Sequence, residues 1–136
     1  MASTLKLEIV TPEAKIYSAD VDMVTLPGAE GEMGIFPMHV PLLTQVAAGE
    51  VVALQGGQDV HLAVGEGFVQ ITGDRVAVMT DMAIRAEDID EAKAEEARRR
   101  AEARLQEKLS DDELAVANAA LVNSLAQLKV KRRGRP

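Results

Sequence analysis

Apolar and polar residues alternate along the first part of the chain with the period of a β-strand. Leu5, Leu7 and Ile9 alternate with charged neighbours, which indicates a strand with one buried face. Further apolar runs of strand length follow at residues 51–54, 60–64, 68–71 and 76–79. Glycine-containing turns separate these runs, and Gly73 with Asp74 predicts a tight hairpin. Because no helical pattern intervenes, we expect a sandwich or barrel of short strands, and runs that are apolar on both faces favour a sandwich with little exposed sheet.

The pattern changes after Ile84 to one that is typical of helices. Residues 87–130 lack glycine, proline and aromatic residues and are rich in Ala, Glu, Arg and Leu. We expect two helices, at about 88–108 and 111–130. The first would begin at Asp88, with Glu91 three residues later, and the second at a capping box formed by Ser110 and Glu113.

Each expected helix carries one apolar stripe with steps of three or four residues. The stripes comprise Ile89, Ala94, Ala97, Ala101 and Leu105 on the first helix, and Leu114, Ala117, Leu121, Leu125 and Leu128 on the second. Alanine buries little apolar area, so the two helices should form a hairpin that docks only weakly on the sheet. The hairpin is therefore either a mobile element or a fixed appendage.

Composition limits the classes of protein to which the chain belongs. With 136 residues, 47% apolar and almost no aromatic residues, it has enough material for one aliphatic core. It contains no cysteine, which excludes disulfides and thiolate sites. No apolar run approaches the length of a membrane span and no signal peptide is evident, so we expect a soluble, intracellular protein.

The net charge of −7 is distributed unevenly along the chain. Residues 1–84 hold only three of the 15 basic residues, which argues against nucleic acid as a partner of this part. The chain ends in a basic segment at 129–135, which is either a solvated terminus or a partner contact.

Residues 25–44 hold three prolines, three glycines and one of the two histidines, and predict a stiff loop that presents something to a partner. A phosphate-binding loop is excluded, because Glu30 and Glu32 lie among the glycines and no helix follows. His39 lacks the companions of a metal site. His61 is expected to point out of a sheet. We expect no catalytic site, and the alternative is a hydrolase that uses Glu32 and His39.

Several cations lie on the first expected helix. Lys93, Arg100 and Arg104 share roughly one side, and Arg98 and Arg99 lie beside them. They could hold a phosphate chain or meet an acidic partner. The alternative is pairing within the helix, as between Glu95 and Arg99 or between Glu96 and Arg100.

Three segments resemble the epsilon subunit of F-type ATP synthases, and the resemblance extends over nearly the whole chain. They are Glu30-Gly-Glu-Met-Gly-Ile-Phe-Pro-x-His-x-Pro-Leu-Leu-Thr44, Gly65-x-Gly-Phe-Val69 and Ala83-Ile-Arg-x-x-Asp88-Ile-Asp-Glu-Ala92. The resemblance implies a β plus α fold, with a flattened β-sandwich at 1–85 and an antiparallel two-helix hairpin at 86–136. It also implies a non-catalytic rotor subunit of the bacterial type, peripheral to the cytoplasmic face of the inner membrane.

The same resemblance implies partners and contact residues. The turn that holds Glu30, Glu32 and Met33 would face the membrane ring, while His39 and Thr44 would lie at the gamma subunit. Arg98, Arg99, Arg100 and Arg104 would meet an acidic segment of the beta subunit and inhibit ATP hydrolysis. The implied partners are gamma, the ring and the alpha and beta subunits, with no nucleic acid and no direct membrane insertion.

Some members of this family bind ATP through a motif of the form Ile/Leu-Asp-x-x-Arg-Ala. The matching segment here is Ile89-Asp90-Glu-Ala-Lys93-Ala94, in which lysine replaces the arginine and lacks its bidentate fork. Asp90, Lys93 and Arg100 are the candidate ligands. We expect weak or absent ATP binding and no metal or other cofactor. A free-standing nucleotide sensor that uses the helical cations is the alternative function.

Overall fold

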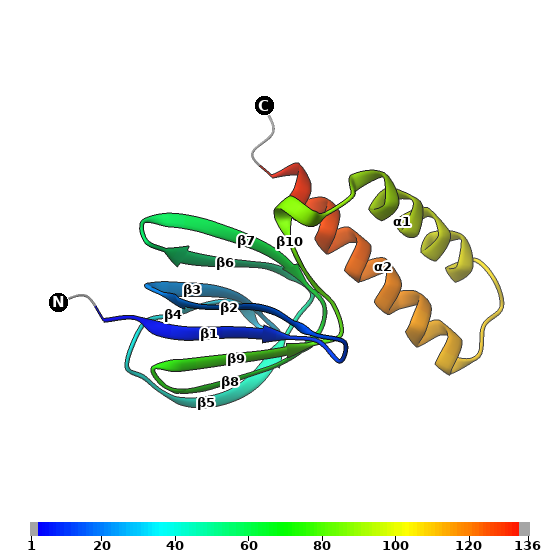
Figure 1. The fold of residues 1–136 in the computed structure, drawn as a ribbon. Coiled ribbons are helices and arrows are strands. Elements are labelled where there is room, and N and C mark those ends of the chain that lie inside the picture. The colour runs from blue at the N-terminus through cyan, green and yellow to red at the C-terminus, as the bar shows by residue number, and fades with distance from the viewer. Residues whose placement is uncertain (1–2, 134–136) are drawn as a thin grey trace.

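Ten β-strands form one strongly curved sheet, and two α-helices follow it, in a computed structural model that describes residues 3–133 (Figure 1). The strands are β1 (Leu5–Val10), β2 (Lys15–Val21), β3 (Met23–Gly28), β4 (Gly31–Ile35), β5 (His39–Val46), β6 (Gly49–Gln55), β7 (Gln58–Val64), β8 (Gly67–Gly73), β9 (Arg75–Thr80) and β10 (Ala83–Arg85). The predicted sandwich of short strands followed by helices is confirmed, and Gly73, with φ of 54°, forms the expected hairpin turn between β8 and β9.

The sheet folds over on itself until its two ends meet. Its hydrogen-bonded order is β10-β7-β6-β3-β5-β8-β9-β1-β2, with β4 paired to β3. β1 and β9 are parallel, whereas the other neighbours are antiparallel. Tyr17 of β2 donates a hydrogen bond of 2.6 Å to Oε1 of Gln55 on β6, and the Arg85 guanidinium of β10 lies 5.1 Å from the centre of the Tyr17 ring. The sandwich is therefore nearly a closed barrel.

An aliphatic core fills the space between the two layers. Leu5, Leu7 and Ile9 are buried, as their alternation predicts. They pack with buried residues from the rest of the sheet, which include Leu26, Ile35, Leu62, Val69, Ile71 and Val78. Burial of this much apolar area is the main stabilising contribution to a domain of this size.

The proline- and glycine-rich stretch at 25–44 is mostly sheet, so the prediction of a loop there was wrong. β3 and β4 form a hairpin whose strands end at the facing pair Gly28 and Gly31. A Cβ at Gly28 would lie 2.6 Å from the Gly31 carbonyl oxygen, so the close approach of the two strands requires glycine. Pro41 lies where the register between β5 and β8 shifts, a place that tolerates a residue without an N–H.

The helices begin and end close to the expected positions, with one correction. α1 runs Glu91–Leu105 and α2 runs Asp111–Arg132. The first helix is not capped by Asp88, which ends the short 3₁₀ helix η1 (Ala86–Asp88); Asp90 caps α1 instead, and its side chain accepts a hydrogen bond of 3.1 Å from the Lys93 N–H. The predicted capping box of Ser110 and Glu113 is present at the start of α2.

α1 and α2 pack antiparallel, and charged side chains join both ends of the pair. Arg132 at the end of α2 donates to Glu91 at 2.7 Å and to Glu95 at 3.0 Å, and Arg104 near the end of α1 donates to Glu113 at 2.7 Å. The basic segment at 129–135 is therefore not simply a solvated terminus: Lys129 and Arg132 belong to α2. Gly134 and Arg135 lie outside the described residues.

The buried positions of α2 differ from the predicted stripe. Ala117 and Leu128 are buried as expected, but Leu114 and Leu125 are exposed. The remaining buried positions of the helix are Ser124, Ala126 and Val130. One stripe cannot describe α2, because its carboxyl-terminal half faces both α1 and the sandwich.

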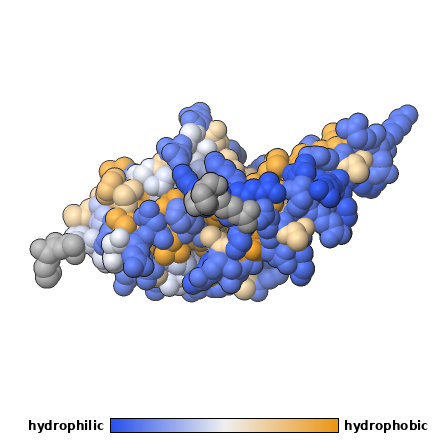
Figure 2. All heavy atoms as spheres, turned by 90° about the horizontal axis from the view of Figure 1, so that it is seen from above, coloured by the Kyte–Doolittle hydropathy of each residue, from blue (hydrophilic) through white to orange (hydrophobic). Residues whose placement is uncertain are grey.

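The hairpin meets the sandwich mainly through α2, which contacts β6 and β7. Ala126 and Val130 of α2 form a small apolar cluster with Ala63 of β7 and Ile89. Beyond this contact the hairpin projects away from the sandwich, and the surface of its projecting part is mostly hydrophilic (Figure 2). Neither α1 nor α2, the two long helices of residues 3–133, is apolar enough over its length to span a membrane.

Candidate partner-binding surfaces

Three large apolar side chains lie exposed together on the outer surface of β5, β8 and β9. Phe68 is 50% exposed and faces Met79, which is 42% exposed, across the β8–β9 ladder, and Leu43 of β5 is 66% exposed. Their neighbours Val69 and Val78 are buried, so alternation turns Phe68 and Met79 outward. We call Leu43, Phe68 and Met79 the β8 face. Clustered exposed apolar residues of this kind usually mark a protein interface.

The sequence suggested that strands with apolar residues on both faces would leave little of the sheet exposed. This does not hold for β8. The outer face of β7 is covered, because α2 packs over Ala63. The outer faces of β8 and β9 have no such cover within residues 3–133. The signal that could have located the β8 face is Phe68 itself, which lies out of phase with the core residues Val69 and Ile71.

A surface hollow of about 640 Å³ adjoins the β8 face. One wall is the β3–β4 hairpin, with Glu30 in its turn and Glu32 and Met33 on β4, and the other side is formed by Leu43, Thr44 and Phe68. The structure therefore brings together four of the five contact residues expected on the sandwich, namely Glu30, Glu32, Met33 and Thr44. Both glutamates are exposed at the rim.

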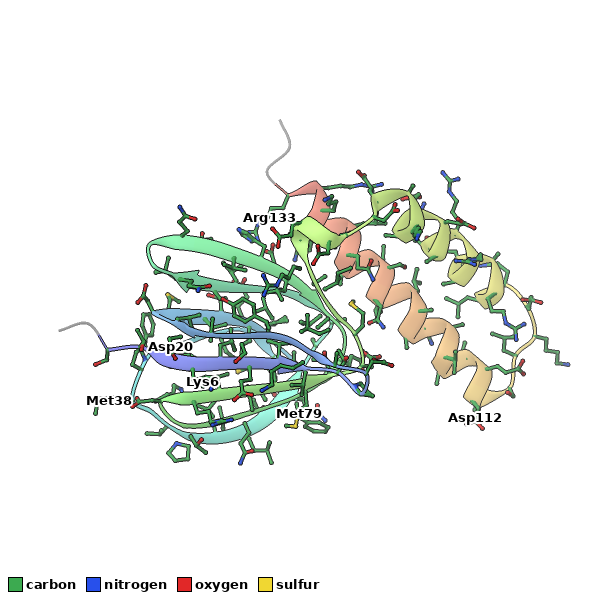
Figure 3. The ribbon with its side chains drawn as sticks, viewed as in Figure 1. Lys6, Asp20, Met38, Met79, Asp112 and Arg133 are labelled. Atoms are coloured by element: carbon green, nitrogen blue, oxygen red, sulfur yellow. The ribbon has the colours of Figure 1, made fainter. Side chains whose placement is uncertain are left out.

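His39 lies elsewhere. It begins β5, opposite Gly73, at the end of the sandwich that is remote from the hollow, and its Nδ1 lies 2.6 Å from the Val40 carbonyl oxygen. Exposed Met38 marks the same end of the sandwich, opposite the hairpin (Figure 3). Glu32 and His39 thus lie at opposite ends of the sheet, which removes the geometric basis for a hydrolase that uses them as a pair.

The four arginines expected to meet a partner differ in how far they are already engaged. Arg98 bonds to Glu95 and, at 2.6 Å, to Glu102. Arg104 bonds to Glu107 at 3.0 Å and also to α2. Arg99 is 75% exposed and lies 3.5 Å from Glu95.

Arg100 is exposed and forms no ion pair within residues 3–133, so the expected pair with Glu96 is absent there. Arg99 and Arg100 are therefore the two cations of this group with most freedom to bind another molecule.

Glu95 lies at the centre of the charged network of the hairpin. Hydrogen bonds from Arg98, and then from Arg132, lower the pKa of its carboxyl from 4.5 to about 2. Bonds to Glu95, and then to Glu102, raise the pKa of the Arg98 guanidinium, whereas bonds to Glu91, and then to Glu95, raise the pKa of the Arg132 guanidinium. One carboxylate thus stabilises both α1 itself and its contact with α2.

The candidate ATP ligands do not converge. The Asp90 carboxylate is occupied as the cap of α1, and Arg100 lies ten residues further, about 15 Å along the helix axis. Arg100 and Arg104 line a groove of about 500 Å³ between α1 and α2 whose walls include Ala97, Ala101 and Ala117, and Lys93 does not line it. Residues 3–133 contain no cluster of three His, Asp or Glu side chains suited to a metal ion.

One further charged group was missed by reasoning from the sequence. Glu50 of β6 has a side chain that is only 5% exposed, and it bonds to His61 of β7 at 3.0 Å and to Arg133. His61 lies outside the sandwich core, as expected, but the bond to Glu50 engages it. The available signal was an acid directly before the apolar run at 51–54.

Comparisons with known proteins match both parts of the chain. The family model of the ATP synthase delta/epsilon chain, beta-sandwich domain, matches residues 4–86, and that of the long alpha-helix domain of the same chain matches residues 87–132. An ATP synthase epsilon chain of Dehalococcoides mccartyi is 47% identical, covering 97% of this chain and 96% of its own. That of Laribacter hongkongensis is 41% identical, with 93% and 92% covered.

Solved structures share the fold. A chain in a mitochondrial ATP synthase structure of Euglena gracilis, which holds OSCP, F1 and the c-ring, superposes with a TM-score of 0.75. It is 24% identical, and the match covers 93% of this chain and 79% of that one. A chain from the central stalk and c-ring structure of the Tetrahymena thermophila enzyme gives a TM-score of 0.66 at 12% identity, with 95% and 97% covered.

Proposed function

The chain belongs to the ATP synthase delta/epsilon chain family as a non-catalytic subunit of the central stalk, and from this premise we propose that the β8 face binds the gamma subunit. The observation that carries this proposal is the exposure of Leu43, Phe68 and Met79 on one surface. Apolar and aromatic side chains dominate the buried centres of protein interfaces. Thr44, beside Leu43, would lie at the rim of the same contact.

Binding to purified gamma, or to its complex with the alpha and beta subunits, tests this proposal. Replacing Phe68 by Ser removes a large exposed anchor without entering the core, and we expect at least about tenfold weaker binding, the usual result for such an anchor. Val116→Ser is the control, because Val116 is also apolar and exposed, at 71%, but lies on α2. Equal affinity of the Phe68 variant and the unchanged chain would refute the assignment.

We further propose that the turn with Glu30 and Glu32 faces the polar loops of the membrane ring of a proton-translocating complex, at the cytoplasmic face of a bacterial inner membrane. Two exposed acids on a tight hairpin, adjoining the β8 face, support a second contact beside gamma. The origin of the relatives in bacteria supports the location.

Glu32→Arg should reduce ATP-driven proton pumping in membrane vesicles relative to ATP hydrolysis. Asp59→Arg, with the same charge change on β7, should not.

For the hairpin we propose inhibition of ATP hydrolysis through contact of Arg99 and Arg100 with an acidic segment of the beta subunit. Their exposure supports this role, whereas Arg98 and Arg104 are engaged inside the hairpin. In the reconstituted complex, replacing Arg99 and Arg100 together by Ala should raise ATPase activity. Lys108→Ala, which removes an exposed cation just beyond α1, is the control. If deletion of residues 88–136 leaves the ATPase rate unchanged, the hairpin has no inhibitory role.

A free-standing nucleotide sensor gains no support from the geometry, because Asp90 is a helix cap and Lys93 lies apart from the groove that Arg100 lines. Weak or absent ATP binding stays our prediction. Calorimetric titration of the isolated subunit with ATP measures it, and micromolar affinity would contradict it.

A further inference from the structure

Polar contacts join the end of α2 to the sandwich. The Arg133 guanidinium bonds to Oε1 of Glu50 on β6, and Lys131 donates to the Ala86 carbonyl oxygen at 3.2 Å. Figure 3 shows Arg133 where α2 ends beside the strands. Among residues 3–133, the pair of Arg133 with Glu50 is the one salt bridge between the hairpin and a strand of the sandwich.

Glu50 is an unusual place for a carboxylate. Its side chain is 5% exposed, and its strand β6 is one of the two that α2 contacts. A buried carboxylate is costly unless it is hydrogen-bonded and paired with a cation. His61, on the neighbouring strand, supplies one bond from within the sandwich, and Arg133 supplies the permanent positive charge from the hairpin.

The apolar part of the same contact is small. Its buried members are Ala63, Ala126, Val130 and Ile89, of which two are alanines, and partly buried Met82, Ile84 and Ala86 pack against them. Alanine contributes only one methyl group of buried apolar surface, so this cluster stabilises docking weakly. The charged pair therefore supplements a modest apolar contact.

We propose that Glu50 and Arg133 form a clasp that keeps the hairpin docked on the sandwich and that opening this pair releases the hairpin as a unit. His61 stays bonded to Glu50 when Arg133 leaves, so the carboxylate keeps one partner in the open state and the clasp closes again readily. The biological meaning of this clasp rests on the proposed regulatory role of the hairpin.

The neighbouring arginine provides a contrast. Arg132 points to α1, where it bonds to Glu91 and Glu95, so it holds the hairpin together internally. Two consecutive arginines thus stabilise two different joints. Removing Arg133 should undock an intact hairpin, whereas removing Arg132 should loosen α1 from α2 without undocking α2.

The isolated 136-residue chain is sufficient for the test, because it contains no cysteine and accepts two spin labels at chosen sites. Labels at Asp59→Cys on β7 and Asp112→Cys at the far tip of the hairpin report the distance between the two parts. Arg133→Gln should enlarge the population of long or broadly distributed distances about tenfold, an effect between those of surface and buried ion pairs. Arg132→Gln should leave the distribution unchanged.

Glu50→Gln should have the same effect as Arg133→Gln, and the double variant no more than either alone, because all three break one pair. Additive effects, or an unchanged distribution in Arg133→Gln, would overturn the clasp. If Glu50→Gln fails to fold, Arg133→Lys serves instead. It keeps the positive charge, so its hairpin should stay docked far more than that of Arg133→Gln. Arg133→Gln could undock the hairpin and yet leave the ATPase rate of the reconstituted complex unchanged. That result would reject the regulatory function of the hairpin but not the clasp.

Discussion

The sandwich and the hairpin are stabilised in different ways. In the sandwich, large side chains such as Leu7, Ile9 and Leu62 are completely buried. In the hairpin, the buried positions of α1 are the alanines Ala94 and Ala101, and ion pairs join the helix ends. Buried area responds mainly to volume changes in the core, whereas ion pairs respond to pH and salt. One chain thus combines a part that resists solution conditions with a part that is sensitive to them.

The largest effect should come from the sandwich core. Leu7→Ala leaves a cavity at a fully buried site and should lower the free energy of unfolding by about 2–5 kcal/mol. Ala101→Gly, at a buried position of α1, should cost only about 1 kcal/mol through backbone entropy. Urea unfolding followed by circular dichroism measures both. Equal costs would mean that the hairpin depends on its core as much as the sandwich does.

Substitutions at Gly65 and Gly67 should affect the two regions differently, although the two glycines are only two residues apart. A Cβ at Gly67 would collide with the Met79 backbone carbonyl in the β8–β9 ladder, so Gly67→Ala should destabilise the sandwich by about 1–3 kcal/mol. The nearest atoms to a Cβ at Gly65 would belong to the side chains of Asp81 and Asn123, which bond to each other across the contact with α2.

Gly65→Ala should therefore disturb docking while the sandwich keeps its stability. The spin-label distance between residues 59 and 112 reports docking, and thermal unfolding reports the sandwich. A stability loss in Gly65→Ala as large as that in Gly67→Ala would show that the docking contact is part of the sandwich core.

The cap of α2 should affect the hairpin alone. Ser110→Ala removes the side chain that accepts from the Glu113 N–H at 3.2 Å, which should cost about 1 kcal/mol of helix stability. Hydrogen exchange of the first turn of α2 should quicken, while exchange in β8 and β9 stays the same. Ser110→Asp, another good capping residue, is the control and should preserve protection.

The smallest effect should appear on acidification. The folded pKa of Glu95 lies below its unfolded value, so its bonds stabilise the hairpin above pH 4.5, and this contribution is lost as the pH falls towards 2. Helicity of the hairpin should decline over that window. Glu95→Gln should flatten that part of the profile, and carbon NMR of the Glu95 carboxyl should follow the low pKa directly. A carboxyl that titrates near 4.5 would contradict the network.

Local features were predictable from the sequence because their causes are local. Alternation placed Leu5, Leu7 and Ile9 in the core, and the spacing of Ser110 and Glu113 located the start of α2. The start of α1 was misplaced because Asp88 and Asp90 are both good caps, but the backbone of Ile89 between them is extended, so the helix can begin only after it, at the cap Asp90. The loop expected at 25–44 is sheet because strand pairing outweighed the preferences of its prolines.

The surfaces were less predictable, since they depend on residues far apart in the sequence. Whether the outer side of a strand is covered depends on α2, which lies over β7 and leaves Phe68 exposed. The family motif identified Glu30, Glu32 and Thr44, which the fold brings together. It gave no sign that His39 lies apart from them, at the other end of β5. Nothing local to Glu50 indicates that Arg133 bonds to it.

The parallel pairing of β1 with β9 has a consequence for biosynthesis. β1 leaves the ribosome long before β9, so its inner residues Leu5, Leu7 and Ile9 lack one neighbouring strand until β9 has emerged. Pairing across so long a stretch of chain is slow, and unpaired apolar strands are prone to aggregate. The nascent chain therefore has a vulnerable interval that lasts until β9 has left the ribosome and paired with β1.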